Sequence, residues 1–440
     1  MRLRRSFVIT VGAASALTLV VAQPAFAADR TWTGTSDAAW STGVGWGGTA
    51  PTDLDALTFA AGPRSTYDLG NRTFTSLSFE ATHEVANGGG VITVGDALDV
   101  GADADVLIAP QLTVPDSQTW TVEEGASLTL PSLVRVEAAS TLRLDVAGTM
   151  TIGAAGNLDG LATACVTKEG PGVLNILGGG GGLGACPGQA AGLHVQDGVV
   201  AVGEAQIGGK DFAVTGGVFA GGTVATPATV HALALSGTGV VSPGAGNGSG
   251  FGAVALWGTS AWTGGTYQVD WDVDAGTSDY VYGDGQAISV SGTVLDVRLA
   301  GTPEVGDSVR ILGSSIAFSG SFSASDGTPL VDGAEFTSNG QVYTVAYLTQ
   351  GTASGVTLNW VRAAPQQPGD DDGDDDGDDD GGGDGDDDGT GGDTGTADDD
   401  ELAATGPSEV ARALLVAGGA LAAGAVLVTT GRRRARIRRA

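Results

Sequence analysis

The sequence is poor in the side chains that most often carry catalysis or bind nucleic acid. Its 440 residues include three histidines, two cysteines and only two lysines, Lys168 and Lys210. The formal net charge of -31 excludes a nucleic-acid-binding protein, because binding to phosphates needs a basic surface. The 75 glycines have no strict three-residue period, which excludes a collagen triple helix. No HExxH or GxSxG motif is present, so we predict a protein that is not an enzyme and holds no metal or cofactor.

Helical spacing is rare between the two ends of the chain, and the N-terminal end is typical of a targeting segment. Residues 1–27 begin with three arginines, continue with an apolar run over 7–21 and finish with Ala-Phe-Ala. A basic start, a short apolar run and a small-x-small ending are typical of a secretory signal peptide. We therefore expect export from the cell and cleavage between Ala27 and Ala28.

The C-terminal end carries a second sorting device. Residues 413–430 are 18 uncharged, mostly apolar residues, near the lower limit for a helix that crosses a ~30 Å hydrocarbon core. Six arginines follow within the last ten residues, and clustered arginine marks the cytoplasmic side of a membrane. Before the apolar segment lies the pentapeptide Leu402-Ala403-Ala404-Thr405-Gly406. In this order, the three elements resemble the cell-wall sorting signal of Gram-positive surface proteins, in the LAxTG form found among actinobacteria, over residues 402–440.

This resemblance implies a partner and a reaction. In the family, a membrane sortase attacks the carbonyl of the bond between Thr405 and Gly406 with a cysteine thiolate, and passes the acyl group to an amine of the peptidoglycan precursor. The chain would then be attached covalently to the cell wall, with its body outside the cell. Ala403 stands where the commoner motif has proline, which leaves the sortase class open. The alternative is a plain single-pass membrane anchor.

An acidic segment with almost no apolar residues links the body to the sorting signal. Residues 363–401 contain 17 aspartates and Glu401. Such a composition cannot bury enough surface to fold, and like charges keep the chain extended, so we predict a disordered linker. Five of its residues match the spacing of an EF-hand loop: Asp376, Asp378, Asp380, Gly381 and Asp387. Because helix-forming flanks are absent, we expect no specific calcium site, and loose calcium association is a hypothesis.

The body, residues 28–362, is predicted to be all-β. Apolar and polar residues alternate in TLRLDV, where every second residue from Leu142 to Val146 would face one side and Arg143 and Asp145 the other. Similar short runs recur along the chain, separated by Gly, Asp, Asn or Ser clusters at intervals of about 8–12 residues. This spacing indicates a sandwich, a barrel or a solenoid, and the likeness among the segments favours the solenoid.

Two stretches of the body resemble the autotransporter-associated β-strand repeat: VTKEGPGVLNILG at 166–178 and AGLHVQDGVVAVG at 191–203. The repeat positions are occupied by Lys168, Gly170, Gly172, Leu174, Gly178, Val195 and Gly198. Ile176 and Val200 replace leucines and keep an apolar, inward role. The resemblance implies a right-handed parallel β-helix, in which stacked rungs bury an apolar interior and the end rungs need caps.

The flanks of the body extend this resemblance. The chain opens with a Trp-rich segment that includes Trp32, Trp40 and Trp46, which we expect to be buried as an N-terminal cap. Pieces similar to a passenger tail follow near the other end, among them VVSPG at 240–244 and SDYVYGDGQAISVSGTVLDVRL at 278–299. The body is therefore expected to be a passenger-like solenoid carried by Gram-positive sorting signals.

The two cysteines, Cys165 and Cys186, bracket the loop of the first repeat, which contains five consecutive glycines. In an exported protein two cysteines usually pair. Closing a loop of about 20 residues stabilises the fold by ~3 kcal/mol in the chain-entropy model. We expect a disulfide with a structural role, because metal binding would need further ligands.

One strand offers candidate acids. Asp270, Asp272 and Asp274 alternate and would line a groove, as carboxylates do in polysaccharide-cleaving β-helices. The favoured alternative is the polar outer face of a half-buried strand. His194 lies next to Val195, and we expect this histidine to point outward.

Tryptophans offer a candidate binding surface. Trp257, Trp262 and Trp271 lie within fifteen residues, and exposed Trp faces stack on sugar rings. Buried packing between rungs is the favoured interpretation, because tryptophan is usually largely buried.

The sequence therefore predicts a secreted, cell-wall-anchored surface protein with a display, adhesive or structural role. Without the linker and the two ends, the body has 10 basic and 32 acidic residues, so its net charge is -22 and its surface repels anionic polymers. Its expected partners are the sortase, peptidoglycan and an unknown surface ligand, either a glycan or a matrix protein. The alternatives are a polysaccharide-acting β-helix enzyme and a passive component of the envelope or surface layer.

Overall fold

The computed structural model describes residues 27–34, 37–153, 158–160, 164–178, 186, 191–203, 206–244, 250–284, 286–316, 318–348 and 354–365. In these ranges the chain forms 35 strands and two short 3-10 helices. No helix within them is long and apolar enough to cross a membrane. The signal peptide up to residue 26, the linker from residue 366 and the whole sorting signal, with Leu402–Gly406 and the apolar segment 413–430, lie outside the described residues.

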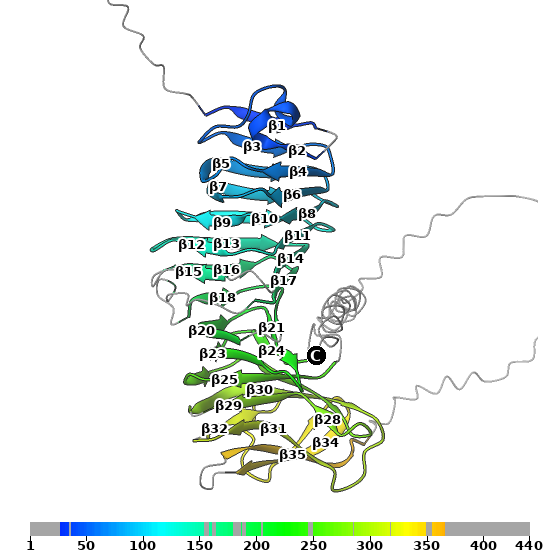
Figure 1. Cartoon of the computed structure of the whole chain (residues 1–440). Coiled ribbons are helices and arrows are strands. Elements are labelled where there is room, and N and C mark those ends of the chain that lie inside the picture. Colours follow the sequence, from blue (N-terminus) through cyan, green and yellow to red (C-terminus); the bar gives the residue numbers. More distant parts are fainter. Residues whose placement is uncertain are drawn as a thin grey trace, which may run out of the picture.

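The strands form a parallel β-solenoid, which confirms the predicted all-β solenoid (Figure 1). In most turns the chain adds one strand to each of three ladders, and each strand pairs in parallel with those one turn before and after it. The first ladder contains β1 (Asp29–Trp32), β3 (Ala56–Phe59), β5 (Arg72–Phe79), β7 (Val91–Val100), β10 (Gln118–Val122), β13 (Thr141–Val146), β16 (Cys165–Glu169), β18 (Leu193–Val195), β20 (Gln206–Val214), β23 (Ala228–Leu235), β26 (Ser260–Trp262), β30 (Ile288–Ala300) and β32 (Phe318–Ser323).

The other two ladders run alongside the first. The second contains β2 (Ala38–Ala39), β4 (Arg64–Tyr67), β6 (His83–Asn87), β8 (Asp105–Ile108), β11 (Ser127–Leu130), β14 (Thr149–Ile152), β17 (Val173–Ile176), β19 (Val199–Val202), β21 (Val218–Ala220), β24 (Val240–Val241) and β27 (Thr266–Asp272). The third contains β9 (Gln111–Val114), β12 (Val134–Val136), β15 (Leu158–Gly160), β25 (Gly252–Leu256), β29 (Tyr280–Gly283) and β31 (Ser308–Ser314), together with the first halves of β5, β7, β20 and β23.

The interior of the solenoid is filled by rows of apolar side chains. On β13, Leu142, Leu144 and Val146 are buried whereas Arg143 and Asp145 are exposed, as the alternation predicts. Leu144 lies opposite a buried Trp on β10, and this Trp lies opposite a buried Leu on β7. Each such side chain contributes about 1.5–3 kcal/mol by leaving water, so the stacked rows stabilise the rod along its whole length.

A lysine occupies one position in this apolar row. Lys168 lies opposite Leu144 and Val195, and none of its surface is exposed. Its Nζ donates hydrogen bonds to the carbonyl oxygens of Glu169 at 2.8 Å and Gly170 at 2.6 Å. Burial lowers the pKa of Lys168 to about 8, against the opposing effect of nearby carboxylates. The first lysine of the predicted repeat therefore ties a turn of the backbone to the interior.

The two stretches that resemble the repeat form successive turns of the solenoid. Val166 and Lys168 pair with Leu193 and Val195, and the strand at 173–176 pairs with the strand at 199–202. The replaced positions, Ile176 and Val200, are fully buried, as expected.

His194 lies on the outward side of its strand, as expected, but neighbouring side chains cover it. It alternates with the inward-facing Leu193 and Val195, yet only 7% of its surface is exposed. Its Nε2 lies 3.0 Å from the Thr215 hydroxyl, and its Nδ1 lies 3.2 Å from the Gln196 amide nitrogen. These polar neighbours enclose the ring, and burial lowers the pKa of His194.

Cys165 and Cys186 are joined by a disulfide with a Cα–Cα distance of 4.7 Å. Cys165 is the first residue of β16, and both cysteines are buried. The bridge links β16 to the segment between β17 and β18.

The N-terminal end of the rod is closed by aromatic side chains. Trp32 belongs to β1, whereas Trp40 and Trp46 belong to the 3-10 helices η1 (Trp40–Thr42) and η2 (Val44–Trp46). All three indoles are buried, and they contact one another edge to face at centroid distances of 5.2 and 5.3 Å. A Cβ at Gly45 would overlap the Trp32 ring. The expected N-terminal cap is confirmed.

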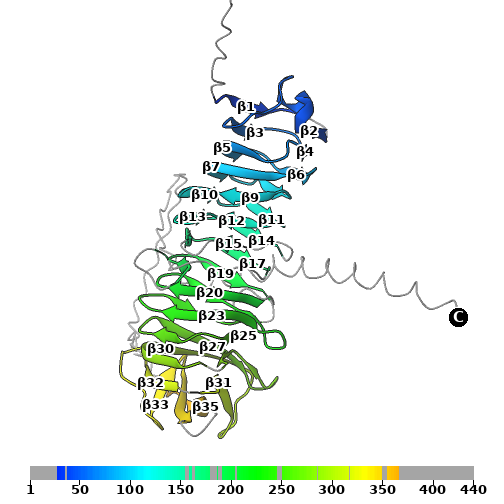
Figure 2. The ribbon, with the colours of Figure 1, turned by 60° about the vertical axis from the view of Figure 1, so that its left-hand side comes forward.

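The opposite end is closed by antiparallel strands (Figure 2). The hairpin β33 (Glu335–Ser338) and β34 (Gln341–Leu348) is followed by β35 (Ser354–Ala363), which pairs antiparallel with both β34 and β31. The parallel ladder thus ends on strands of the other direction, and β35 lies at the end of the rod farthest from β1 (Figure 1).

Candidate functional site

The acidic strand β27 presents its carboxylates on the outer side of the solenoid. Val269 and Trp271 are buried, whereas Asp270 and Asp272 are partly exposed. Asp272 accepts a hydrogen bond from the backbone N–H of Ala275 at 2.9 Å and so supports the turn after the strand. Asp274 accepts one from the N–H of Thr302 at 3.2 Å. These positions match the polar outer face of a half-buried strand rather than a groove of free carboxylates.

A fourth carboxylate, which the sequence pattern did not reveal, lies beneath this strand. Asp279 has no exposed surface. It accepts hydrogen bonds from the backbone N–H groups of Gly252 at 2.8 Å and Asp270 at 3.2 Å, and the N–H of Gly244 also donates to it. Burial and the neighbouring Asp270 raise the pKa of Asp279 to about 8, although the N–H donors oppose the shift.

Asp279 connects the two tail pieces that the sequence singled out. Gly244 ends the VVSPG piece, and Asp279 lies at the start of the 278–299 piece. A Cβ on Gly244 would lie 2.7 Å from the carboxylate oxygen Oδ1, so the close approach requires glycine. The sequence around Asp279 shows only an aspartate directly before the alternating run YVYG. Its role was not predictable from that position, because its partners lie up to 35 residues earlier in the chain.

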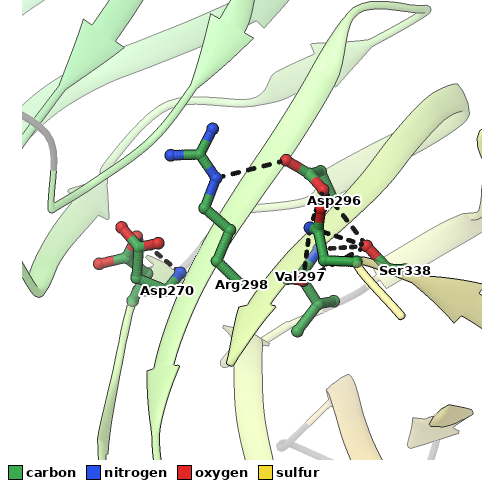
Figure 3. Close-up of polar contacts among 7 residues, drawn as sticks. Asp270, Asp296, Val297, Arg298 and Ser338 are labelled. Atoms are coloured by element: carbon green, nitrogen blue, oxygen red, sulfur yellow. Dashed lines mark hydrogen bonds and ion pairs between the residues drawn. The ribbon is translucent and has the colours of Figure 1, made fainter. Parts of the chain in front are cut away.

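Arg298 on β30 lies between the carboxylates of Asp270 and Asp296 (Figure 3). It is opposite Asp270 in the ladder, and its Nε is 3.7 Å from Oδ2 of Asp296. Burial raises the pKa of Asp270, and the charge of Arg298 works against this shift. Ser338 of the terminal hairpin accepts a hydrogen bond from the N–H of Val297 at 2.9 Å. The cluster therefore joins β27, β30 and β33 into one support for the C-terminal end.

The geometry of this cluster limits its chemistry. A general acid must reach the bond that it protonates, but the side chain of Asp279 has no exposed surface and both of its oxygens accept backbone N–H groups. Asp270 is close to it but is also only partly exposed. A raised carboxyl pKa indicates a functional site only when a ligand can reach the group. The arrangement is suited to holding the backbone.

The three neighbouring tryptophans divide into two kinds. Trp262 and Trp271 are buried in the interior, and the Trp262 indole donates to the carbonyl of Leu233 at 3.0 Å. Trp257 differs, because 51% of its surface is exposed. All eight tryptophans lie in the described residues, and Trp257 is the exposed one among them. Buried packing is thus confirmed for two of the three, and the surface interpretation fits Trp257.

Trp257 lies on a corner between the third and first ladders, which we call the Trp257 corner. Successive turns place these residues on it: Asp211, His231, Trp257, Thr259, Asp284 and Gln286. The backbone N–H of Trp257 donates to the carbonyl of His231 at 3.0 Å. A Cβ on Gly258 would lie 2.8 Å from the imidazole of His231, so glycine lets the two turns approach closely. His231 in turn pairs with Asp211, and both side chains are partly exposed.

The residues next to the predicted signal cleavage are also visible. Ala27 is exposed, and Ala28 is partly buried at the start of the first turn. The N–H of Ala28 donates to Oδ1 of Asp55 at 2.9 Å, and Asp55 itself has no exposed surface. Asp55 was not singled out by the sequence, since its partner Ala28 lies 27 residues earlier.

The remaining predicted site residues, Leu402 to Gly406, lie outside the described residues, as do the EF-hand-like aspartates of the linker. Across the part of the chain that the structure describes, no group of three or more His, Cys, Asp or Glu side chains is arranged to hold a metal ion.

Comparison with known protein families finds no family that matches the chain, and comparison with curated proteins finds none that matches it significantly in sequence.

Proposed function

We propose that this protein is a surface rod: it is exported, attached to the cell wall through its C-terminal sorting signal, and presents its β-solenoid in a display, adhesive or structural role. The observation that carries this proposal is the layout of the rod. Its capped N-terminal end and the last strand, β35, lie at opposite ends (Figure 1), and the acidic segment and sorting motif follow β35 in the sequence. A tether on that side would direct the aromatic cap away from the cell.

The dimensions support a role in reaching outward. Neighbouring strands lie ~4.8 Å apart, so the thirteen strands of the first ladder extend the rod by about 55–60 Å. A fully extended linker of thirty-odd residues would add at most roughly 110 Å.

We propose that the solenoid winds right-handed, that the linker is disordered, that residues 413–430 span the membrane before sorting, and that the body belongs with passenger-like repeat proteins.

The Trp257 corner is the surface that we propose for contact with a ligand. A half-exposed indole offers a flat apolar face, while Thr259, Gln286 and the pair of His231 and Asp211 offer hydrogen-bonding groups on adjacent turns. Sugar rings combine apolar faces with hydroxyl groups, so this mixture suits a glycan. The acidic surroundings and the net charge of -22 favour a neutral chain over an anionic one.

Cell fractionation tests the anchoring. The full chain and the variant Thr405→Ala are expressed in a Gram-positive host that has a sortase for this motif class. We expect the parent protein in the wall fraction, released by a muramidase with a peptidoglycan fragment attached after Thr405. The variant should stay in the membrane fraction, because its scissile bond is not recognised. A Ser408→Ala variant, at the third residue after the cleaved bond, is the matched control and should sort normally. Sorting of the Thr405→Ala chain into the wall would contradict the proposal.

A further inference from the structure

We propose that removal of the signal peptide completes the N-terminal end of the rod, because cleavage creates a positive charge at Ala28 that pairs with the buried carboxylate of Asp55. The proposal rests on the export and cleavage included in the proposed function. Hydrolysis adds water across the bond between Ala27 and Ala28, leaving a carboxylate on Ala27 and a primary amine on Ala28. At neutral pH this amine takes up a proton and becomes an ammonium group.

The backbone of Ala28 is already held in place for this contact. Its nitrogen lies 2.9 Å from Oδ1 of Asp55, and its carbonyl oxygen accepts the N–H of Ala56 at 3.0 Å. The next residue, Asp29, pairs with Ala56 at the start of the first ladder. The new chain end therefore needs no rearrangement to reach the carboxylate.

The other oxygen of Asp55 has its own donors. Oδ2 accepts from Nε of Arg30 at 3.2 Å, from the N–H of Thr52 at 2.8 Å and from the Thr52 hydroxyl at 3.1 Å. Burial opposes ionisation, yet the hydrogen bonds from Thr52, Ala28 and Arg30 together hold the pKa of Asp55 below its usual value. Asp55 is thus a carboxylate at neutral pH, and Oδ1 faces Ala28.

The remaining charged groups near this contact do not compete for it. Asp29 is exposed on β1, and Asp53 pairs with Arg72 at 3.0 Å. Before cleavage, the Ala28 N–H is a neutral amide donor. After cleavage, it belongs to a cation, and charge-assisted hydrogen bonds are about twice as strong as neutral ones. Since Trp32 lies on the same short strand, fixing its first residues also fixes the aromatic cap.

The experiment compares full chains that begin at different residues, each purified in a mild detergent. One begins at Ala28, and a second carries a single additional glycine before Ala28, which displaces the charge and leaves Asp55 intact. Asp55→Asn and Asp53→Asn are both made in the chain that begins at Ala28. Asp53→Asn serves as the matched control for Asp55→Asn. The rate at which an amine reagent labels the α-amino group is followed by mass spectrometry from pH 6 to 10, together with hydrogen exchange of β1 and β3.

We expect pairing to raise the pKa of the Ala28 amine by about one unit above its ordinary 7.7–8.0, so that labelling at pH 7 is about tenfold slower than in the glycine-extended chain. Asp55→Asn should remove the difference, and Asp53→Asn should keep it. A raised amine pKa stabilises the folded state fully below the ordinary pKa and loses this effect as pH rises through the folded-state value. Protection of β1 in the Ala28 chain should therefore fall above about pH 9.

Two results would overturn the proposal. Equal labelling rates in the Ala28 and glycine-extended chains would show that no charge pair forms, whether or not Asp55→Asn folds. A natural exported protein that begins at another residue would show that the pair is not made in the cell, and of the proposed function it would contradict only the cleavage point. Wall anchoring is measured separately, so its failure is distinguishable from either result.

Discussion

The two ends of the rod each contain a fully buried aspartate, and the structure stabilises the two carboxyl groups in opposite ways. At the N-terminal end, Asp55 accepts backbone N–H groups and also contacts the guanidinium of Arg30, so its pKa lies below the usual value in spite of burial. At the C-terminal end, burial and the nearby Asp270 raise the pKa of Asp279 to about 8, and the donors found for it are backbone N–H groups.

The difference lies in the neighbours: Asp279 is more strongly desolvated and lies beside the like charge of Asp270, whereas Asp55 has hydrogen bonds from Thr52, Ala28 and Arg30 that outweigh its burial. It also gives the two ends opposite responses to pH. A depressed carboxyl pKa stabilises the fold above pH ~4 and loses this effect as the carboxyl is protonated below that pH. A raised carboxyl pKa means that the native state binds more protons than the unfolded state between pH ~4 and 8, so stability falls as pH rises through that window.

The largest effect is expected from opening the N-terminal cap. Trp40→Ala removes an indole that contacts Trp46 and Tyr67 at centroid distances of 5.3 and 5.1 Å. The free energy of unfolding should fall by about 3–5 kcal/mol, the usual range for removing a large buried aromatic side chain. Urea unfolding measures the total, and hydrogen exchange shows where protection is lost. Loss confined to the first turns would mark the two ends as independent, whereas an equal loss at β35 would contradict that separation.

An intermediate effect is expected at the C-terminal end. Asp279→Asn removes the titrating group and keeps one acceptor oxygen for the N–H of Gly252, while its NH2 group replaces the oxygen that accepts from the N–H of Asp270. The parent protein should be less stable at pH 8 than at pH 5, by about 1–3 kcal/mol, and the variant should lose this difference. Urea midpoints at the two pH values give the answer. Asp284→Asn, an exposed carboxylate nearby, is the control. An unchanged pH dependence in the Asp279 variant would place the titrating group elsewhere.

The smallest effect on stability is expected between the ends, at the Trp257 corner. Trp257→Ala removes a side chain that is 51% exposed, so the free energy of unfolding should change by no more than about 0.5 kcal/mol. Retention of the displayed protein on a neutral polysaccharide should nevertheless fall about tenfold, as expected for loss of a central binding residue. Ile316→Ala removes an apolar side chain that is similarly exposed and should leave retention unchanged. Undiminished retention in the Trp257 variant would exclude this corner as the contact.

Much of the fold was predictable, because a solenoid repeats a local pattern. The alternation from Leu142 to Val146 fixes which side chains face the interior, and the repeat at 166–178 and 191–203 places Ile176 and Val200 inside. The Trp-rich opening indicated a cap, because three large aromatic side chains at a chain end need burial. These predictions use only the order of residues within one strand or one copy of the repeat.

The rest depends on contacts between turns, which a single sequence does not display. His194 was expected to face outward, but its sequence neighbours gave no sign that Gln196 and Thr215 would cover the ring. Asp55 and Asp279 gain their roles from Ala28 and Gly252, each 27 residues away. The contact of Trp257 with His231 also joins two turns. The sequence therefore did not show that Trp257 is exposed whereas Trp262 and Trp271 are buried.

The buried lysine has a practical consequence for detecting this protein on cells. Surface proteins are commonly tagged through primary amines, and the body offers two lysines for that chemistry. Lys168 has no exposed surface, and its Nζ is engaged by the carbonyls of Glu169 and Gly170. A lysine-directed reagent therefore does not reach Lys168 in the folded rod, and surveys that count tagged lysines will under-represent this protein. Carboxyl-directed coupling, which has 32 acidic residues in the body to choose from, is the better way to find it.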